Sequence, residues 1–217
     1  MSVLPLIGSK VDPKGRVMHR STFLSAALIG SSLVLMPGFT EASELPQRVH
    51  VLIAYHSMTG HTEKMAQGIM DGAKTVPGTD VVLKRVGQVT AKDLFSADAV
   101  VVGSPVYWSN MAGEVKTFFD NWQLKFGVFP EFKMRDKVGA AFATGGQVAG
   151  GKEVTMLTIL AAMLGNQMIV VSGGGAFGAS ATTEGESPGI DDKELAAAKV
   201  LGKRVAEVAR VVKRGRQ

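Results

Sequence analysis

The chain has 217 residues, 46% of them hydrophobic and 20% charged, which is enough to bury one substantial core and short for two independent domains. Its formal net charge of +5 favours anionic ligands, but the basic residues are scattered and do not alternate with aromatic residues, so no nucleic-acid partner is expected. Because cysteine is absent, disulfides, thiolate metal sites and cysteine nucleophiles are excluded, and we expect no metal centre.

The first 42 residues differ in composition from the rest of the chain. Basic residues precede an apolar stretch at residues 23–36, and small residues follow it, which is the layout of an export signal. The apolar stretch is shorter than the roughly 20 residues of a membrane-spanning helix, so no stable membrane anchor is expected. The sequence therefore predicts a cleaved export signal segment at residues 1–42 and one folded domain at residues 43–217.

Two interpretations of this segment stay open. We expect an exported, periplasmic protein; a cytoplasmic protein, or an organellar one with a transit peptide rich in Ser and Arg, is the alternative. The signal is complete without the residues before Met18, so Met18 is an alternative initiator to Met1.

From residue 49 onward, short apolar runs alternate with segments of helical periodicity. The predicted strands are 49–55, 80–85, 99–102, 138–143 and 168–172, and the predicted helices are 61–76, 112–122, 152–164 and 191–213. Strands that are apolar on both faces and joined by helices form a parallel sheet that is covered on both sides. The sequence therefore predicts an α/β fold, with a doubly wound five-stranded parallel sheet in a three-layer sandwich.

In such a sheet, ligands bind at the carboxyl ends of the strands where the strand order reverses. The loop after the first strand has the chemistry of a phosphate cradle: a glycine allows close backbone approach, the following helix start offers free N–H groups, and hydroxyls add donors. The candidate residues are Ser57, Met58, Thr59, Gly60, His61 and Thr62. The loop lacks the glycine and lysine pattern of a P-loop or a Rossmann turn. Alternatively, Ser57 or Thr59 simply caps the helix.

The loop after the third strand carries two neighbouring aromatics and an amide. Its residues Pro105, Val106, Tyr107, Trp108, Ser109 and Asn110 suit a flat ring such as isoalloxazine, which needs a stacking face and hydrogen-bond donors at its polar edge. The alternative is a hydrophobic turn that covers the sheet edge. The glycine-rich loop after the fourth strand, with Thr144, Gly145 and Gly146, permits close approach to such a ring, and ordinary loop flexibility is its alternative explanation.

Together these three loops resemble those of the flavodoxin-like NAD(P)H:quinone oxidoreductases of the Trp-repressor-binding-protein type, over residues 49–209. The resemblance implies a flavodoxin-like fold, noncovalent FMN, and NAD(P)H and quinone as small-molecule substrates. It also implies a homo-oligomer, either a dimer or a tetramer. The first loop would hold the phosphate, and the other two would border the ring.

One domain leaves no room for a second nucleotide module, so we expect NAD(P)H and quinone to alternate at one flavin face in a substituted-enzyme mechanism. No catalytic side chain is predicted, because the flavin carries out the hydride chemistry. Two alternatives are a flavodoxin-like electron carrier without its own NAD(P)H activity and an interaction protein that binds no flavin.

Overall fold

The computed structural model describes residues 48–183 and 189–216. The strands are β1 (Val49–Tyr55), β2 (Thr79–Arg85), β3 (Ala99–Tyr107), β4 (Asn110–Met111), β5 (Val138–Gly145), β6 (Ile169–Val170) and β7 (Ala179–Thr182). The helices are α1 (His61–Lys74), α2 (Ala91–Ser96), α3 (Gly113–Leu124), α4 (Lys152–Gly165) and α5 (Asp192–Arg214), and a short 3₁₀ turn, η1 (Val86–Gln88), precedes α2. The predicted export signal at residues 1–42 lies outside the described residues.

The sheet has the strand order β2-β1-β3-β5-β6, and neighbouring strands in this order run parallel. The chain moves from β1 outward to β2 and then returns to the other side of β1 to form β3. The strand order therefore reverses between β1 and β3, which is where ligands bind in open α/β sheets. This arrangement confirms the predicted α/β fold with a doubly wound parallel sheet of five central strands.

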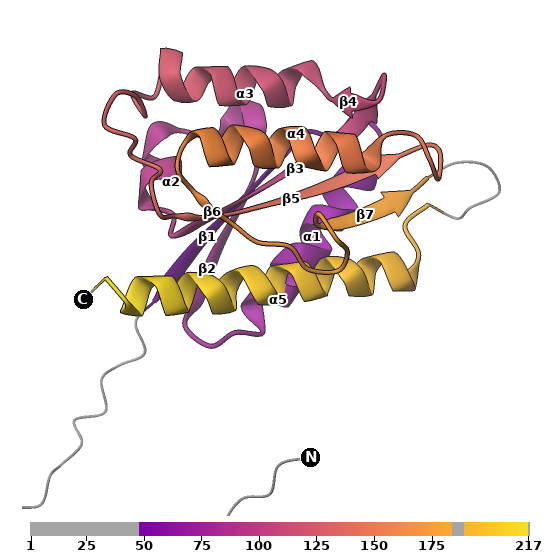
Figure 1. Ribbon diagram of the computed structural model, residues 1–217. Helices are drawn as coiled ribbons and strands as arrows, with labels where there is room; N and C mark the ends of the chain where they lie inside the picture. The colour runs from indigo at the N-terminus through magenta and orange to yellow at the C-terminus, as the bar shows by residue number, and fades with distance from the viewer. Residues whose placement is uncertain (1–47, 184–188, 217) are drawn as a thin grey trace, which may run out of the picture. The chain divides into compact units, whose positions relative to one another are not determined.

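Helices cover both faces of the sheet (Figure 1), with α1 and α5 on one face and α3 and α4 on the other. Each face buries its own apolar cluster, because every second residue of a strand points to the same side. The α1–α5 contact is close: a Cβ on Gly202 would lie 1.9 Å from the carbonyl oxygen of Ile69. A capping box at Asp191 and Glu194 starts α5.

The fifth predicted strand is split in the structure. Only Ile169–Val170 of the predicted 168–172 pairs with β5, and a second short strand, β7, pairs with β5 farther along. Between β6 and β7 the chain leaves the sheet, and the glycines in this segment explain how it can do so. Gly174 adopts φ +73 and Gly178 φ +138, and a Cβ on Gly178 would lie 1.9 Å from the carbonyl oxygen of Ala141. The chain leaves the sheet and returns to it where only glycine fits.

Candidate functional site

The first predicted loop connects β1 to α1 at the carboxyl edge of the sheet. Gly60 is the N-cap of α1 with φ +88, a left-handed conformation that favours glycine, and no side chain caps the helix. Ser57 Oγ instead accepts a hydrogen bond from Gly60 N at 3.1 Å, and Thr59 Oγ1 lies 2.9 Å from His61 Nδ1. The alternative that Ser57 or Thr59 caps α1 is therefore wrong. A helix start without a side-chain cap can receive an anion.

Arg85, the last residue of β2, holds this loop in place. Its guanidinium donates to Ser57 O at 2.6 Å and to Glu63 Oε2 at 2.8 Å, and it lies 5.7 Å from the centre of the Tyr55 ring. Burial raises the pKa of the Tyr55 phenol, and the neighbouring Glu63 carboxylate adds to this effect. Arg85 was not among the predicted site residues, although its place at the carboxyl end of the second predicted strand pointed to this edge.

Two buried threonines join the first and third loops. Thr62 Oγ1 and Thr144 Oγ1 lie 2.8 Å apart, although they are 82 positions apart in the chain. Thr62 is in the first turn of α1, and Thr144 is near the end of β5. Their hydrogen bond brings the helix start and the third loop into one site.

The second predicted loop is a β-hairpin rather than an irregular loop. β3 extends to Tyr107, which pairs with Asn110, and the two turn residues, Trp108 and Ser109, have φ values of 50 and 61. Such positive values at both turn residues are typical of tight hairpin turns. The Trp108 side chain is 100% exposed and Tyr107 is 42% exposed, so neither covers the sheet edge as the alternative interpretation requires.

Asn110 is oriented by two hydrogen bonds to its side-chain oxygen. Met111 N donates to Asn110 Oδ1 at 2.8 Å, and Thr158 Oγ1 donates to it at 3.0 Å. With its oxygen used in this way, the amide of Asn110 can offer a ligand its NH₂ donors.

The second and third loops enclose a small cleft of about 240 Å³. It is lined by Val106, Trp108, Ser109, Gly146, Gln147 and Gly150. The two loops touch beside it, since a Cβ on Gly151, which has φ +101, would lie 2.7 Å from Ser109 Cα. Of the predicted ring-bordering residues, the cleft brings together Val106, Trp108, Ser109 and Gly146, and glycine permits this closeness. Pro105, Tyr107, Thr144 and Gly145 do not line it, and Asn110 lines a separate cleft beside Thr158.

Lys152, at the start of α4, anchors the third loop. The residue is 4% exposed, and its Nζ donates to Gln147 O at 2.7 Å, Val148 O at 3.2 Å and Thr182 Oγ1 at 2.8 Å. Across residues 48–183 and 189–216, no carboxylate forms an ion pair with it. These contacts argue against ordinary loop flexibility. The only feature of the sequence that pointed to Lys152 was its position directly after a glycine-rich loop. That position does not indicate that the side chain is buried.

The assembled site offers uncapped helix amides and hydroxyls beside a narrow glycine-lined cleft. These features fit a phosphate ester joined to a flat ring: the anion would meet the amides, and the ring would lie between the hairpin and the third loop. A Cβ on Gly60 would meet nothing within 4 Å, so there is open space in front of the helix start. Within the described ranges, no group of three His, Asp or Glu side chains could hold a metal ion. No helix in the same ranges is long and apolar enough to cross a membrane.

Comparisons with known proteins identify related chains. The family described as NADPH-dependent FMN reductase matches residues 86–183. The chain is 34% identical over 200 residues to a NAD(P)H dehydrogenase (quinone) of Geotalea daltonii, with 73% of this chain and 96% of that protein covered. It is also 34% identical over 158 residues to a flavodoxin of Clostridium saccharobutylicum, with 72% and 94% covered.

A solved structure has the same fold. A flavodoxin, WrbA-like protein from Agrobacterium tumefaciens matches with a TM-score of 0.64 and 25% sequence identity. The match covers 75% of this chain and 98% of that one, so it takes in nearly the whole of the solved structure.

Proposed function

Because the chain belongs to the flavodoxin-like NAD(P)H dehydrogenase (quinone) family, we propose that it is an FMN-dependent oxidoreductase that transfers two electrons from NAD(P)H to a quinone. The observation that carries this function is the Thr62–Thr144 hydrogen bond, which joins an uncapped helix start to a glycine-lined cleft. A phosphate site and a ring site next to each other suit FMN.

In this proposal the first loop binds the phosphate of FMN. The N–H groups of the first turn of α1 and the hydroxyls of Ser57, Thr59 and Thr62 donate to the phosphate oxygens, with Met58, Gly60 and His61 completing the loop. Arg85 keeps the loop in shape by donating to Ser57 O. Neutral donors and the helix dipole then hold a phosphate monoester without a cation in direct contact.

The other two loops border the ring. Val106, Trp108 and Ser109 of the hairpin line one side of the cleft, and residues 144–146 lead into its other side. The NH₂ group of Asn110 would donate to the polar edge of the ring, and Lys152 keeps the third loop in position by donating to Gln147 O. When bound there, FMN would supply the hydride and electron-transfer chemistry. The side chains bind and orient, which is why no catalytic acid or base is assigned.

We further propose a substituted-enzyme mechanism in which NAD(P)H and quinone take turns at the ring. The cleft between the hairpin and the third loop supports this proposal, because its volume of about 240 Å³ is too small for both substrates to lie beside the flavin ring at once. Steady-state rates of the FMN-loaded protein, measured at several concentrations of both substrates, should give parallel double-reciprocal plots. Intersecting lines, with both substrates bound at once, would contradict the mechanism while leaving the activity intact.

The similarity to a flavodoxin favours a second candidate function, an electron carrier without its own NAD(P)H activity. Carriers of this kind are typically acidic where their partners are basic, whereas this chain is basic. A protein that binds FMN but oxidises neither NADH nor NADPH, with or without quinone, would support the carrier and overturn the enzyme.

We also propose that the protein forms a homo-oligomer, a dimer or a tetramer. Exposed apolar side chains support this: Met58 is 74% exposed, Trp108 100% and Val148 81%, one from each candidate loop or its continuation. Sedimentation equilibrium of the FMN-loaded protein tests it, and a monomer at micromolar concentration would contradict it.

Export is proposed separately, on the composition of residues 1–42 alone. The test is fractionation of bacteria that express the full chain, followed by determination of the N-terminal sequence. A periplasmic protein that begins near residue 43 is the expected result, and an unprocessed protein in the cytoplasm would overturn the proposal.

A further inference from the structure

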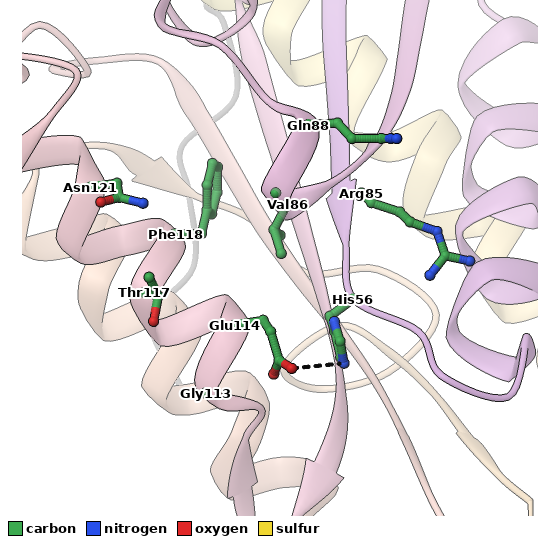
Figure 2. A pocket seen from close by; sticks show the side chains of 10 residues that line it. His56, Arg85, Val86, Gln88, Gly113, Glu114, Thr117, Phe118 and Asn121 are labelled. Atoms are coloured by element: carbon green, nitrogen blue, oxygen red, sulfur yellow. Dashed lines mark ion pairs between the residues drawn. The ribbon is translucent and has the colours of Figure 1, made fainter.

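A second cleft, of about 780 Å³, opens between α3 and the segment that follows β2 (Figure 2). It shares no lining residue with the small cleft between the hairpin and the third loop. It is connected to the phosphate loop in two ways: His56 directly precedes Ser57 in the chain, and Arg85 donates to Ser57 O. The proposed cofactor therefore leaves this cleft without an assigned ligand.

The cleft has an apolar floor. Val86 and Phe118, which are 6% and 2% exposed, contribute to it from η1 and α3. The cleft is open at Gly87 and Gly113, which also line it, because a Cβ on either glycine would meet nothing within 4 Å. A flat heterocycle that packs on such a floor removes its own apolar surface from water.

Polar side chains follow one face of α3 along the cleft. Glu114, Thr117 and Asn121 are spaced by three and four residues, so they share this face, and Figure 2 shows them one after another along the helix. In the described part of the chain, the side chains of Thr117 and Asn121 form no hydrogen bond. An amide, a hydroxyl and a carboxylate are thus available in a row beside an apolar floor.

His56 adds an unsatisfied polar atom to this row. Its Nε2 is buried and has no hydrogen-bond partner among the described residues, and Glu114 Oε1 lies 3.7 Å away, which is too long for a hydrogen bond. A buried nitrogen without a partner is costly. A bound hydroxyl group that reaches both His56 and Glu114 would remove this cost.

We propose that the cleft binds the adenosine half of the pyridine nucleotide, an inference that rests on the proposed function. The amide of Asn121 matches the adenine edge, which offers a donor and an acceptor side by side. Glu114 accepts from the ribose hydroxyls, as acidic residues do in NAD sites. The order of these groups along α3 places adenine at the Asn121 end and ribose at the Glu114 end.

The same geometry selects NADH over NADPH. A carboxylate next to the ribose repels the 2′-phosphate of NADPH. The Arg85 guanidinium also lines the cleft, but its charge is paired with the Glu63 carboxylate at 2.8 Å, so it compensates only in part for the repulsion by Glu114. The proposed cleft therefore predicts a preference for NADH, which the cofactor loops alone do not predict.

Calorimetric titration of the purified protein with 5′-AMP tests the cleft without any turnover. Asn121→Leu should weaken 5′-AMP binding about tenfold, as loss of a paired amide contact predicts. The control is Gln123→Leu, which also replaces a side-chain amide of α3 by leucine but at an exposed position outside the cleft, and it should leave the affinity unchanged. In turnover, Asn121→Leu should raise the KM for NADH by the same factor and leave kcat unchanged.

A second variant covers the case in which Asn121→Leu does not fold. Glu114→Gln should raise the affinity for 2′,5′-ADP, the corresponding end of NADPH, about tenfold relative to 5′-AMP. Unchanged affinities in both variants, or no 5′-AMP binding by a protein that is reduced by NADH, would overturn the inference and leave the proposed function standing. Selective 5′-AMP binding by a protein that takes up no FMN would overturn the proposed function and support the cleft.

Discussion

At the scale of single residues, the two cationic side chains nearest the candidate site, Arg85 and Lys152, donate hydrogen bonds to backbone carbonyl oxygens. Arg85 donates to the carbonyl of Ser57, and Lys152 donates to the carbonyls of Gln147 and Val148. The donors left to face a ligand are neutral hydroxyls and amides, such as those of Thr59 and Asn110. These neutral donors were predictable from the sequence because they lie within loops of recognisable composition. The roles of Arg85 and Lys152 were not predictable, because they depend on contacts between residues far apart in the chain.

Replacing Lys152 tests its role as an anchor. Lys152→Met keeps much of the side-chain length but leaves three acceptors without their donor, so the free energy of unfolding should fall by about 1–3 kcal/mol. Affinity for FMN should fall about tenfold, because the third loop loses its shape. Urea unfolding and flavin fluorescence measure both effects. Lys199→Met, at an exposed position of α5, should change neither, and an equal loss in this control would contradict the anchor role.

Gly60 provides a backbone test of the phosphate loop. Gly60→Ala meets no steric obstacle, but at φ +88 it should cost roughly 1–2 kcal/mol of stability and weaken FMN binding. Gly165→Ala is the matched control, since its Cβ also meets nothing within 4 Å and its φ is not positive. Thermal unfolding and FMN titration of both variants decide the question. Normal FMN affinity in Gly60→Ala would show that the conformation of this loop does not matter for binding.

At the scale of elements, the two strands near the site that the sequence did not predict, β4 and β7, are both short. β4 has two residues and β7 has the sequence Ala-Ser-Ala-Thr, so neither carries the apolar run that made the five central strands recognisable. At the turn of the hairpin, Trp108 and Ser109 both adopt positive φ. Such turns usually carry glycine or asparagine at these two positions, so no local feature of the sequence indicated a hairpin here. The type of an element was predictable from the sequence where the burial of an apolar run determines it. It was not predictable where a short strand forms only because it pairs with a distant strand.

The short helix α2 depends on its cap. Asp93 accepts from Thr90 N at 2.8 Å and from Lys84 Nζ at 2.7 Å. Burial acts to raise the pKa of Asp93, but hydrogen bonds from Lys84 and Thr90 outweigh it and lower the pKa from 3.8 to about 2.

This lowered pKa predicts how the stability of α2 depends on pH. A depressed pKa in the folded state adds stability that is complete above the unfolded value near 4 and is lost as pH falls through about 2. Asp93→Asn should therefore cost about 1–2 kcal/mol at pH 7, and the difference from the unaltered protein should shrink between pH 4 and pH 2. Urea unfolding across this range measures it. A difference that is independent of pH would contradict the assignment.

At the scale of the whole described domain, the strand order places three distant loops at one edge of the sheet. β1, β3 and β5 are adjacent and parallel, so the loops that follow them meet at their carboxyl ends (Figure 1). The alternation of apolar runs and helical segments was enough to predict this arrangement. The cleft beside α3 was not predictable, because residues 56, 86, 114 and 121 meet only once the sheet and its helices have packed.

The central claim is that this edge binds FMN and passes electrons from a pyridine nucleotide to a quinone. The most direct measurement is the anaerobic absorbance spectrum of the protein mixed with FMN, then with NADH, and finally with a water-soluble quinone. We expect the flavin bands to shift on binding, to bleach with NADH and to return with quinone. An FMN spectrum that the protein leaves unchanged would contradict the cofactor assignment, and a bound flavin that NADH does not bleach would contradict the activity.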